Sequence, residues 1–177
     1  MALTAIPNTP AIDLFPTAPV SQPSPLLNAQ YVACDPLNGN YFTATNRDLV
    51  TFICLPASSA AAWSTTVTYT QGQVVNGGSP AGTYIALANP SPNLNQSPGT
   101  SPTFWALYAS STLSITSAPD SCTGRTANVV SYPLPVFDST QQSVEFLVLP
   151  SSVFTQANGQ VQFQASSNLV YVYVRNL

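Results

Sequence analysis

The chain has 177 residues, which is enough for one ordinary domain with a small insertion to bury a core without disulfide bonds. Only 5% of the residues are charged and 45% are hydrophobic, whereas about a quarter of an ordinary soluble domain is charged. The net charge of -3, without lysine or histidine, argues against nucleic-acid binding, because clustered Lys and Arg hold phosphate backbones. So little charge leaves little repulsion between copies, which favours self-assembly over a sticky extracellular monomer.

Residues 1–27 have the composition of an extended arm. They hold six prolines and no clear hydrophobic periodicity, which favours a polyproline-like conformation. The spaced apolar residues in this segment indicate an arm that lies along a neighbouring subunit, and a disordered tail is the alternative. No basic residue precedes a continuous apolar run, as a secretory signal requires, so we expect a protein made and kept in a cytoplasm. No stretch approaches the roughly 20 apolar residues of a membrane-spanning helix.

The next segment has the pattern of strands. Asn38-Gly39 is a tight-turn signal between the apolar runs 31–33 and 41–43, which predicts a β-hairpin. Residues 49–55 are apolar at both odd and even positions. That pattern is typical of a strand covered on both faces.

Strand-like sequence then stops near Leu55 and resumes near Thr112. The intervening residues 60–111 have an aromatic and glycine spacing of their own. Insertions are tolerated at loop tips, because the entropy of loop closure grows slowly with length. We therefore predict an inserted module, 60–111, within a discontinuous host domain formed by 28–59 and 112–177.

The second half of the host continues the strand pattern. Strands are expected at 113–115, 125–136, 144–148, 161–164 and 170–175, several of them with alternating apolar residues. Apolar residues do not recur at helical spacing over a useful length. The sequence therefore predicts an all-β protein whose host domain is a β-sandwich or jelly-roll-like fold.

The three cysteines, Cys34, Cys54 and Cys122, are widely spaced and have no histidine to complete a zinc site. We expect small buried apolar residues and neither a metal nor a cofactor. A Cys34–Cys54 disulfide between neighbouring strands is possible, and the sequence does not decide whether it forms.

The order of several host segments resembles that of the head-decoration, or capsid-associated, β-sandwich proteins of tailed bacteriophages. The segments are Ala33 to Phe42, Leu49 to Leu55, Gly124-Arg125, Val153-Phe154, Asn158 to Val161, and Val172 to Arg175. The resemblance covers about 90 residues outside the module and depends on the order rather than on any single motif. It implies a protein without enzymatic activity that binds a capsid lattice in many copies.

The module resembles the small chitin- and cellulose-binding modules of bacterial glycosidases. The matching residues are Trp63, Tyr69, Gly72-Gln73-Val74-Val75, Tyr84-Ile85-Ala86 and the segment from Pro98 to Trp105. Gln73 stands where those modules usually have a charged residue, and the segment before Trp105 lacks an additional Trp. The resemblance implies a compact three-stranded β fold.

Aromatic rings bind sugars by stacking on the C–H face of a pyranose. Carried over from the resemblance, Trp105 is the first candidate for an exposed platform and Tyr84 the second, while Trp63 and Tyr69 are expected in the core of the module. The alternative is that all four rings are core, because so small a domain has few other ways to bury apolar area.

The sequence argues against an enzyme. Glycoside hydrolysis needs two carboxylates across one bond, but the six acidic residues are scattered singly. Serine nucleophiles need a neighbouring base, and neither His nor Lys is present.

We therefore expect a virion structural protein on the capsid surface that decorates a phage head and displays the module outward. Its expected partners are the major capsid protein and copies of itself. The alternative is a carbohydrate-binding adhesin of a tail, fibre or secreted scaffold, with host-surface polysaccharide as its partner. The sequence leaves the oligomeric state and the lattice position open.

Overall fold

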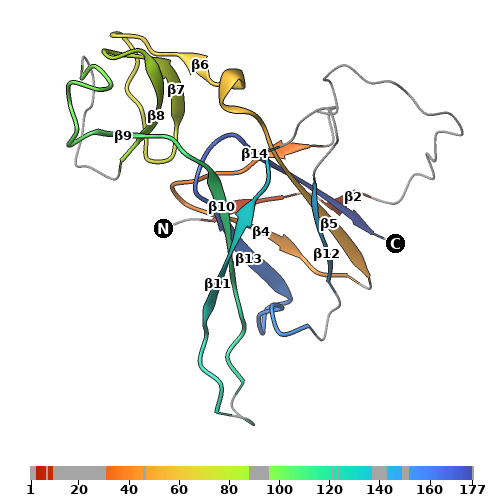
Figure 1. The fold of residues 1–177 in the computed structure, drawn as a ribbon. Helices are drawn as coiled ribbons and strands as arrows, with labels where there is room; N and C mark the ends of the chain where they lie inside the picture. The colour runs from red at the N-terminus through yellow and green to blue at the C-terminus, as the bar shows by residue number, and fades with distance from the viewer. Residues whose placement is uncertain are drawn as a thin grey trace, which may run out of the picture.

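The structure, a computed structural model, describes residues 3–6, 8–9, 31–45, 47–87, 96–120, 122, 124–136, 143–148 and 152–176. Regular structure in this part of the chain consists of strands and one 3-10 turn, η1 (Ala57–Ser59) (Figure 1). The strands form three sheets. The prediction of an all-β protein is confirmed.

The host domain is a sandwich of two five-stranded sheets. The first sheet has the order β1 (Thr4–Ala5), β4 (Asn40–Thr43), β13 (Gln160–Ala165), β10 (Ser111–Thr116) and β11 (Val129–Leu134). The second has the order β12 (Val144–Val148), β5 (Asp48–Cys54), β14 (Val170–Asn176) and β2 (Asn8–Thr9), with β3 (Val32–Ala33) also paired to β14. The predicted β-sandwich is confirmed, and the strand order does not establish its jelly-roll variant.

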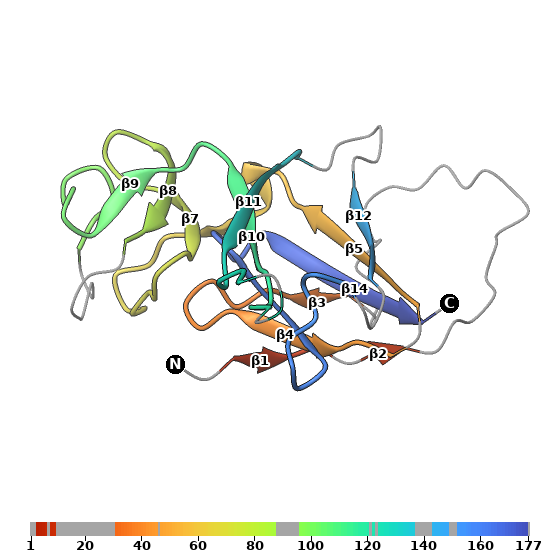
Figure 2. The ribbon, with the colours of Figure 1, turned by 90° about the horizontal axis from the view of Figure 1, so that it is seen from below.

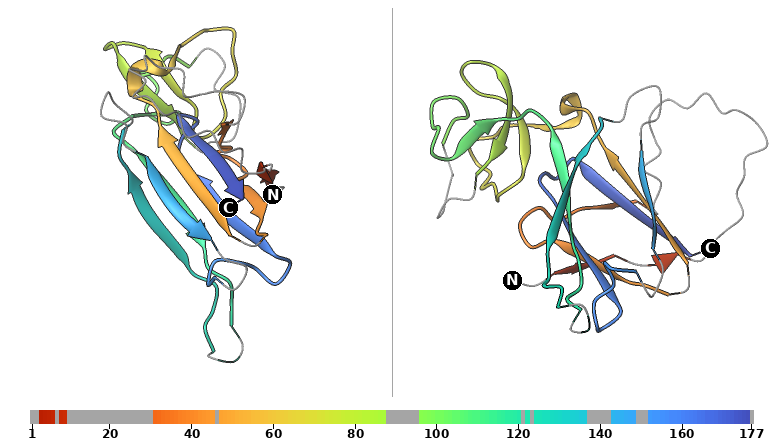
Figure 3. Two further views of the ribbon diagram at one scale, coloured as in Figure 1. Left: turned by 90° about the vertical axis from the view of Figure 1, so that its right-hand side faces the viewer. Right: turned by 60° about the horizontal axis from the view of Figure 1, so that its bottom comes forward.

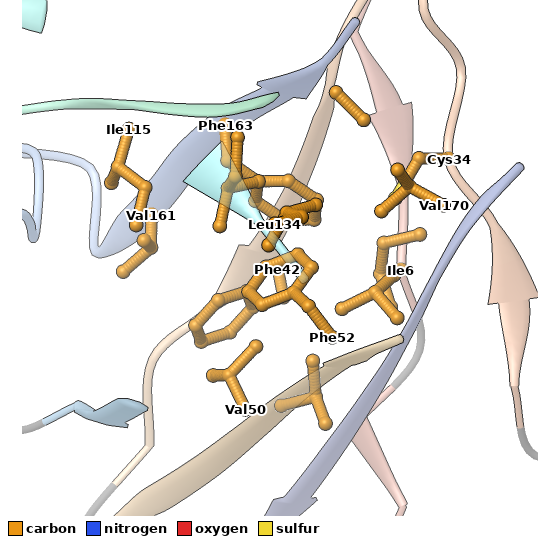
Figure 4. Packing of buried hydrophobic residues seen from close by; sticks show 14 of the residues in the cluster. Ile6, Cys34, Phe42, Val50, Phe52, Ile115, Leu134, Val161, Phe163 and Val170 are labelled. Carbon is orange, nitrogen blue, oxygen red and sulfur yellow. The ribbon is translucent and has the colours of Figure 1, made fainter. Parts of the chain in front are cut away.

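The core forms where the alternating apolar positions of the two sheets face each other (Figure 4). Val170, Val172 and Val174 on β14 are completely buried, because every second side chain of a strand points to the same face. Phe52 of β5 meets Phe163 of β13 edge to face, with ring centroids 5.1 Å apart. This contact joins the two sheets near the centre of the sandwich.

The prediction that residues 49–55 form a strand covered on both faces is confirmed. In β5, Phe52 and Cys54 point into the sandwich, while Thr51 and Ile53 on the outer face are also buried. β5 pairs on one side with β12 and on the other with β14. It is therefore a central strand of its sheet.

The predicted hairpin around Asn38-Gly39 is wrong, although the turn exists. β3 pairs with β14 in one sheet, whereas β4 pairs with β1 and β13 in the other. The Asp35 carboxylate accepts hydrogen bonds from the backbone amides of Leu37 and Asn38, and the Gly39 amide donates to the Asp35 carbonyl at 3.0 Å. This wider turn carries the chain from one sheet to the other, so a turn signal alone did not determine which strands pair.

The predicted arm, residues 1–27, is corrected at its start, because residues 3–6 and 8–9 belong to the host sandwich and neither lie along a neighbouring subunit nor form a disordered tail. β1 pairs in parallel with β4, and β2 pairs in parallel with β14. Between them Ile6 is buried in the main core, and its amide donates to the Tyr41 carbonyl at 2.7 Å. The segment therefore crosses from one sheet to the other. Residues 10–27 of the predicted arm lie outside the described residues.

Cys34 and Cys54 are buried and unbonded, and Cys122 is exposed and also unbonded. The Cys34 amide donates to the Val170 carbonyl, and Val170 is the β-ladder partner of Cys54. The two cysteines thus flank β14 from opposite sides, about two strand spacings (~9.5 Å) apart, whereas a disulfide needs Cα atoms within about 7 Å. The open alternative of a Cys34–Cys54 bridge is excluded in this fold.

The inserted segment folds as a third sheet at one end of the sandwich (Figures 1 and 2). Its strands are β6 (Ala61–Ala62), β7 (Val74–Gly77), β8 (Gly82–Ala86) and β9 (Trp105–Leu107), in that order across the sheet. Among the described residues these strands pair only with one another. The expected three-stranded fold is corrected to four, because β6 adds a short parallel strand to the edge of β7.

Replacing Ile6 by Ala tests whether the N-terminal segment belongs to the core. We expect the free energy of unfolding to fall by about 2–5 kcal/mol, as for other large-to-small changes in a core. Chemical denaturation measures the loss, with the exposed Val153→Ala as the matched control. An effect of Ile6→Ala no larger than that of the control would contradict the assignment.

The turn at Asp35 predicts a dependence of stability on pH. Burial raises the pKa of this carboxyl, but hydrogen bonds from Asn38, Leu37 and Thr4 outweigh burial and hold the pKa below its ordinary value. A carboxylate with a lowered folded pKa stabilises the fold above its unfolded pKa, and this contribution is lost as the pH falls through the folded pKa.

We therefore expect Asp35→Asn to lower stability at neutral pH and to approach the parent protein below about pH 4. Urea unfolding at several pH values measures the difference. A difference that stays constant from neutral to acidic pH would argue against this role of the carboxylate.

Candidate functional site

The aromatic residues of the module form its own small core. Tyr84 and Trp105 are buried there with Val75 and Ala86, and Trp63 and Tyr69 pack against them while remaining partly exposed. The structure thus brings all four predicted site residues together. It brings them together as a packed cluster rather than as an open row of rings.

Trp105 is not an exposed platform, which corrects the first site prediction. Its side chain is 3% exposed. Its indole Nε1 donates to the Gln96 carbonyl at 2.8 Å, and its ring meets Tyr69 edge to face at 5.2 Å between centroids. Because β9 places Trp105 directly opposite Ala86 of β8, the large ring covers the small side chain and fills the interior.

The second candidate, Tyr84, is also buried, and its hydroxyl donates to the Pro80 carbonyl at 2.8 Å. Trp63 and Tyr69 pack against the core, as expected. The Tyr69 hydroxyl accepts from the Ser64 amide at 2.7 Å. The Trp63 indole nitrogen is buried and has no hydrogen-bond partner among the described residues.

The module is fastened to the host by the loop between β13 and β14. The Asn168 amide donates to the Gly72 carbonyl at 3.0 Å, and the Asn168 side-chain oxygen accepts from the Val74 amide at 2.9 Å. Gly72 has a φ of +82°, and a Cβ there would lie 2.3 Å from the Cβ of Pro36. Only glycine allows this approach of the module to the host.

A buried hydroxyl network lies at the same junction. The Tyr108 hydroxyl bonds Ser111 at 2.8 Å, and Ser111 bonds Ser167 at 2.6 Å. Ser111 and Ser167 are completely buried, and burial is the main cause of the raised pKa of Tyr108. Sequence reasoning missed Asn168 and this network, because isolated Ser and Asn residues carry no local signal of burial.

Exposed apolar side chains gather in two regions. Across the described residues seven large apolar side chains are exposed. Val67, Leu87 and Leu107 belong to the module, and Val129 and Leu147 lie on β11 and β12. Val136 bridges to Cys54 of β5, and the Val153 carbonyl accepts from the Ala118 amide after β10. We call the region of β11, β12, Val129 and Leu147 the open edge.

β11 and β12 are the outer strands of the two host sheets on the same side of the sandwich (Figure 3). Their partly buried rings Tyr132 and Phe146 meet between them, with centroids 5.4 Å apart. In the described part of the chain, β11 pairs only with β10 and β12 only with β5. Within the described ranges the outer edges of both strands are therefore unpaired, and proteins normally cover or protect such edges.

Charge is distributed unevenly along the molecule. Residues 60–111 contain no charged side chain. Arg47 precedes β5, Arg125 lies in the β10–β11 hairpin and Arg175 is near the end of β14. Since the module follows the end of β5 and precedes β10, all three cations lie at the strand ends opposite the module, where the hairpin extends past the sandwich (Figure 1).

Comparison with protein-family models, with curated proteins and with solved structures finds no match. No helix in the described ranges is long and apolar enough to cross a membrane. Within those ranges no three His, Cys, Asp or Glu side chains form a group able to hold a metal ion. The geometry defines an all-β sandwich that carries an uncharged accessory sheet.

The packing of Trp105 leads to a direct test. Trp105→Ala should cost about 3–5 kcal/mol, as expected for a buried aromatic ring, and should unfold the module. Hydrogen exchange would show loss of protection in β7, β8 and β9. The control is Leu107→Ala on the same strand, where the side chain is 72% exposed. Retained protection of these strands in Trp105→Ala would contradict the burial of the Trp105 ring in the core of the module.

Proposed function

We propose that this chain is a structural protein of a tailed-bacteriophage virion that decorates the capsid surface in many copies. In this role it is made in the host cytoplasm, binds the major capsid protein and neighbouring copies of itself, and catalyses no reaction. The proposal combines the resemblance of the host segments with the surface properties of the sandwich.

The observation that carries the proposal is the open edge. Leu147 is 50% and Val129 57% exposed there, next to two strands whose outer edges pair with no other strand in the described part of the chain. Apolar side chains and free strand edges together favour association. A partner that covers this edge would bury apolar surface and satisfy backbone hydrogen bonds in a single contact.

The arrangement of the module supports outward display. Its sheet is at one end of the sandwich, fastened through Asn168 and Gly72 to the host. The module is uncharged, whereas the opposite end of the sandwich, which we call the charged end, carries Arg47, Arg125 and Arg175. We place the lattice contact on the open edge and the charged end, with the module directed away from the capsid.

The adhesin alternative concerns the module rather than the host. With Trp105 and Tyr84 buried, Trp63 and Tyr69 are the partly exposed rings of the original four. A sugar platform on the module would have to use these two. The uncharged surface of the module fits an outward spacer, as the proposed orientation requires.

Quantifying the chain in purified virions tests the proposal. A decoration protein is present in many copies per particle, whereas a tail adhesin is present in few, and a low copy number would contradict decoration. In the same particles Leu147→Ser should reduce occupancy several-fold without changing the melting temperature, because an exposed side chain contributes little to folding.

Leu107→Ser is the matched control, since it removes a leucine side chain that is even more exposed, at 72%, from the module. We expect it to leave occupancy unchanged. Reduced occupancy for Leu107→Ser but not for Leu147→Ser would place the attachment surface on the module and overturn the orientation.

A further inference from the structure

A crevice of about 210 Å³ lies where the module meets the outer face of the first host sheet. Gln71 comes from the module, Thr112 and Ser114 from β10, Gln164 from β13, Ser166 from the turn that follows, and Pro36 from the β3–β4 turn. None of these side chains is charged. We infer that this crevice binds a single neutral sugar or a similar uncharged polyol.

The first argument is the free hydrogen-bonding capacity around the crevice. The side-chain amide of Gln71 has no partner among the described residues, so both its nitrogen donor and its oxygen acceptor are available. The side-chain nitrogen of Gln164, Nε2, donates to the Pro36 carbonyl at 2.7 Å, which leaves the side-chain oxygen of Gln164 able to accept. The Ser166 hydroxyl accepts from the Thr112 amide at 2.9 Å, so its own proton is available for donation. A hydroxyl, which is both donor and acceptor, complements this mixture.

The second argument is electrostatic. No cation lines the crevice, so an anion would have no counter-charge, and an ammonium group would find no free carboxylate. The nearest acid in sequence to Pro36 is Asp35, which already accepts four hydrogen bonds from Thr4, Leu37 and Asn38. Desolvating an unpaired charge is costly. The lining therefore selects a neutral ligand.

The third argument is rigidity. Ser114 and Gln164 are direct partners across the β10–β13 ladder, and the Ser166 amide donates to the Thr112 carbonyl at 2.9 Å. On the module side, Gln71 adjoins Gly72, which is held by Asn168 and packed against Pro36. The backbone of both walls is thus fixed before a ligand arrives, which reduces the entropy lost on binding.

The size of the crevice limits the ligand. Pockets for drug-sized molecules have volumes of roughly 300–1,000 Å³, so about 210 Å³ suits one sugar ring and excludes a buried oligosaccharide. No aromatic ring lines the crevice, so binding would depend on hydrogen bonds rather than stacking. We expect weak affinity, with a Kd of about 1 mM or higher.

The test is a titration of the isotope-labelled full chain with glucose, galactose and N-acetylglucosamine, each followed by backbone amide NMR shifts. At least one sugar should give saturable shifts at Gln71, Thr112 and Ser166. Gln71→Ala should weaken that binding about 5-fold or more, the effect of losing one or two hydrogen bonds. Gln71 is exposed, so its replacement should leave the fold intact.

Gln162→Ala is the matched control, because Gln162 lies on β13 two residues from Gln164 and does not line the crevice. It should bind as the parent does. The inference is overturned if no sugar gives saturable shifts, if Gln71→Ala binds unchanged, or if the shifts centre on Trp63 and Tyr69. It does not rest on capsid attachment, so failure of this titration and failure of the virion experiment are separate results.

Discussion

The pairing of β5 with β14 is the constraint on which the rest of the molecule depends. These strands are seven residues each and run antiparallel along their whole length. The free edge of β14 then receives both β3 and β2, so the N-terminal segment is held by the last strand of the chain. The module leaves the host after β5, and the loop that enters β14 contains Asn168, which holds the module in place. The same pair therefore organises the core, the N-terminus and the orientation of the module.

The size of the module explains why its aromatic residues are internal. A unit with so few residues has little apolar surface to bury. β9 places Trp105 in the small hydrophobic core of the module. The Trp105 indole also closes the module by bonding the Gln96 carbonyl. A ring used in this way is not available for stacking. Sugar recognition by the module thus competes with its folding for the same side chains.

The scarcity of charge has different consequences on different surfaces. On the open edge it leaves Val129 and Leu147 exposed on strands that pair on one side alone among the described residues, which favours association. On the outer face of the first sheet it leaves amides and hydroxyls, which favours a neutral ligand. One compositional property thus supports two proposed interactions, because the two surfaces differ in apolar content and in shape.

The sequence by itself determined the all-β class, the doubly covered strand at 49–55 and the sandwich, because side-chain alternation is a local property that survives without knowledge of partners. It also indicated where the module interrupts the host. Only the tertiary structure decided which strands pair, since the Asn38-Gly39 turn leads into a different sheet. Only the tertiary structure placed Ile6 in the core, buried Trp105 and formed the crevice from Gln71, Gln164 and Ser166. These features depend on contacts between segments far apart in the chain, and such contacts leave no mark on local composition or periodicity.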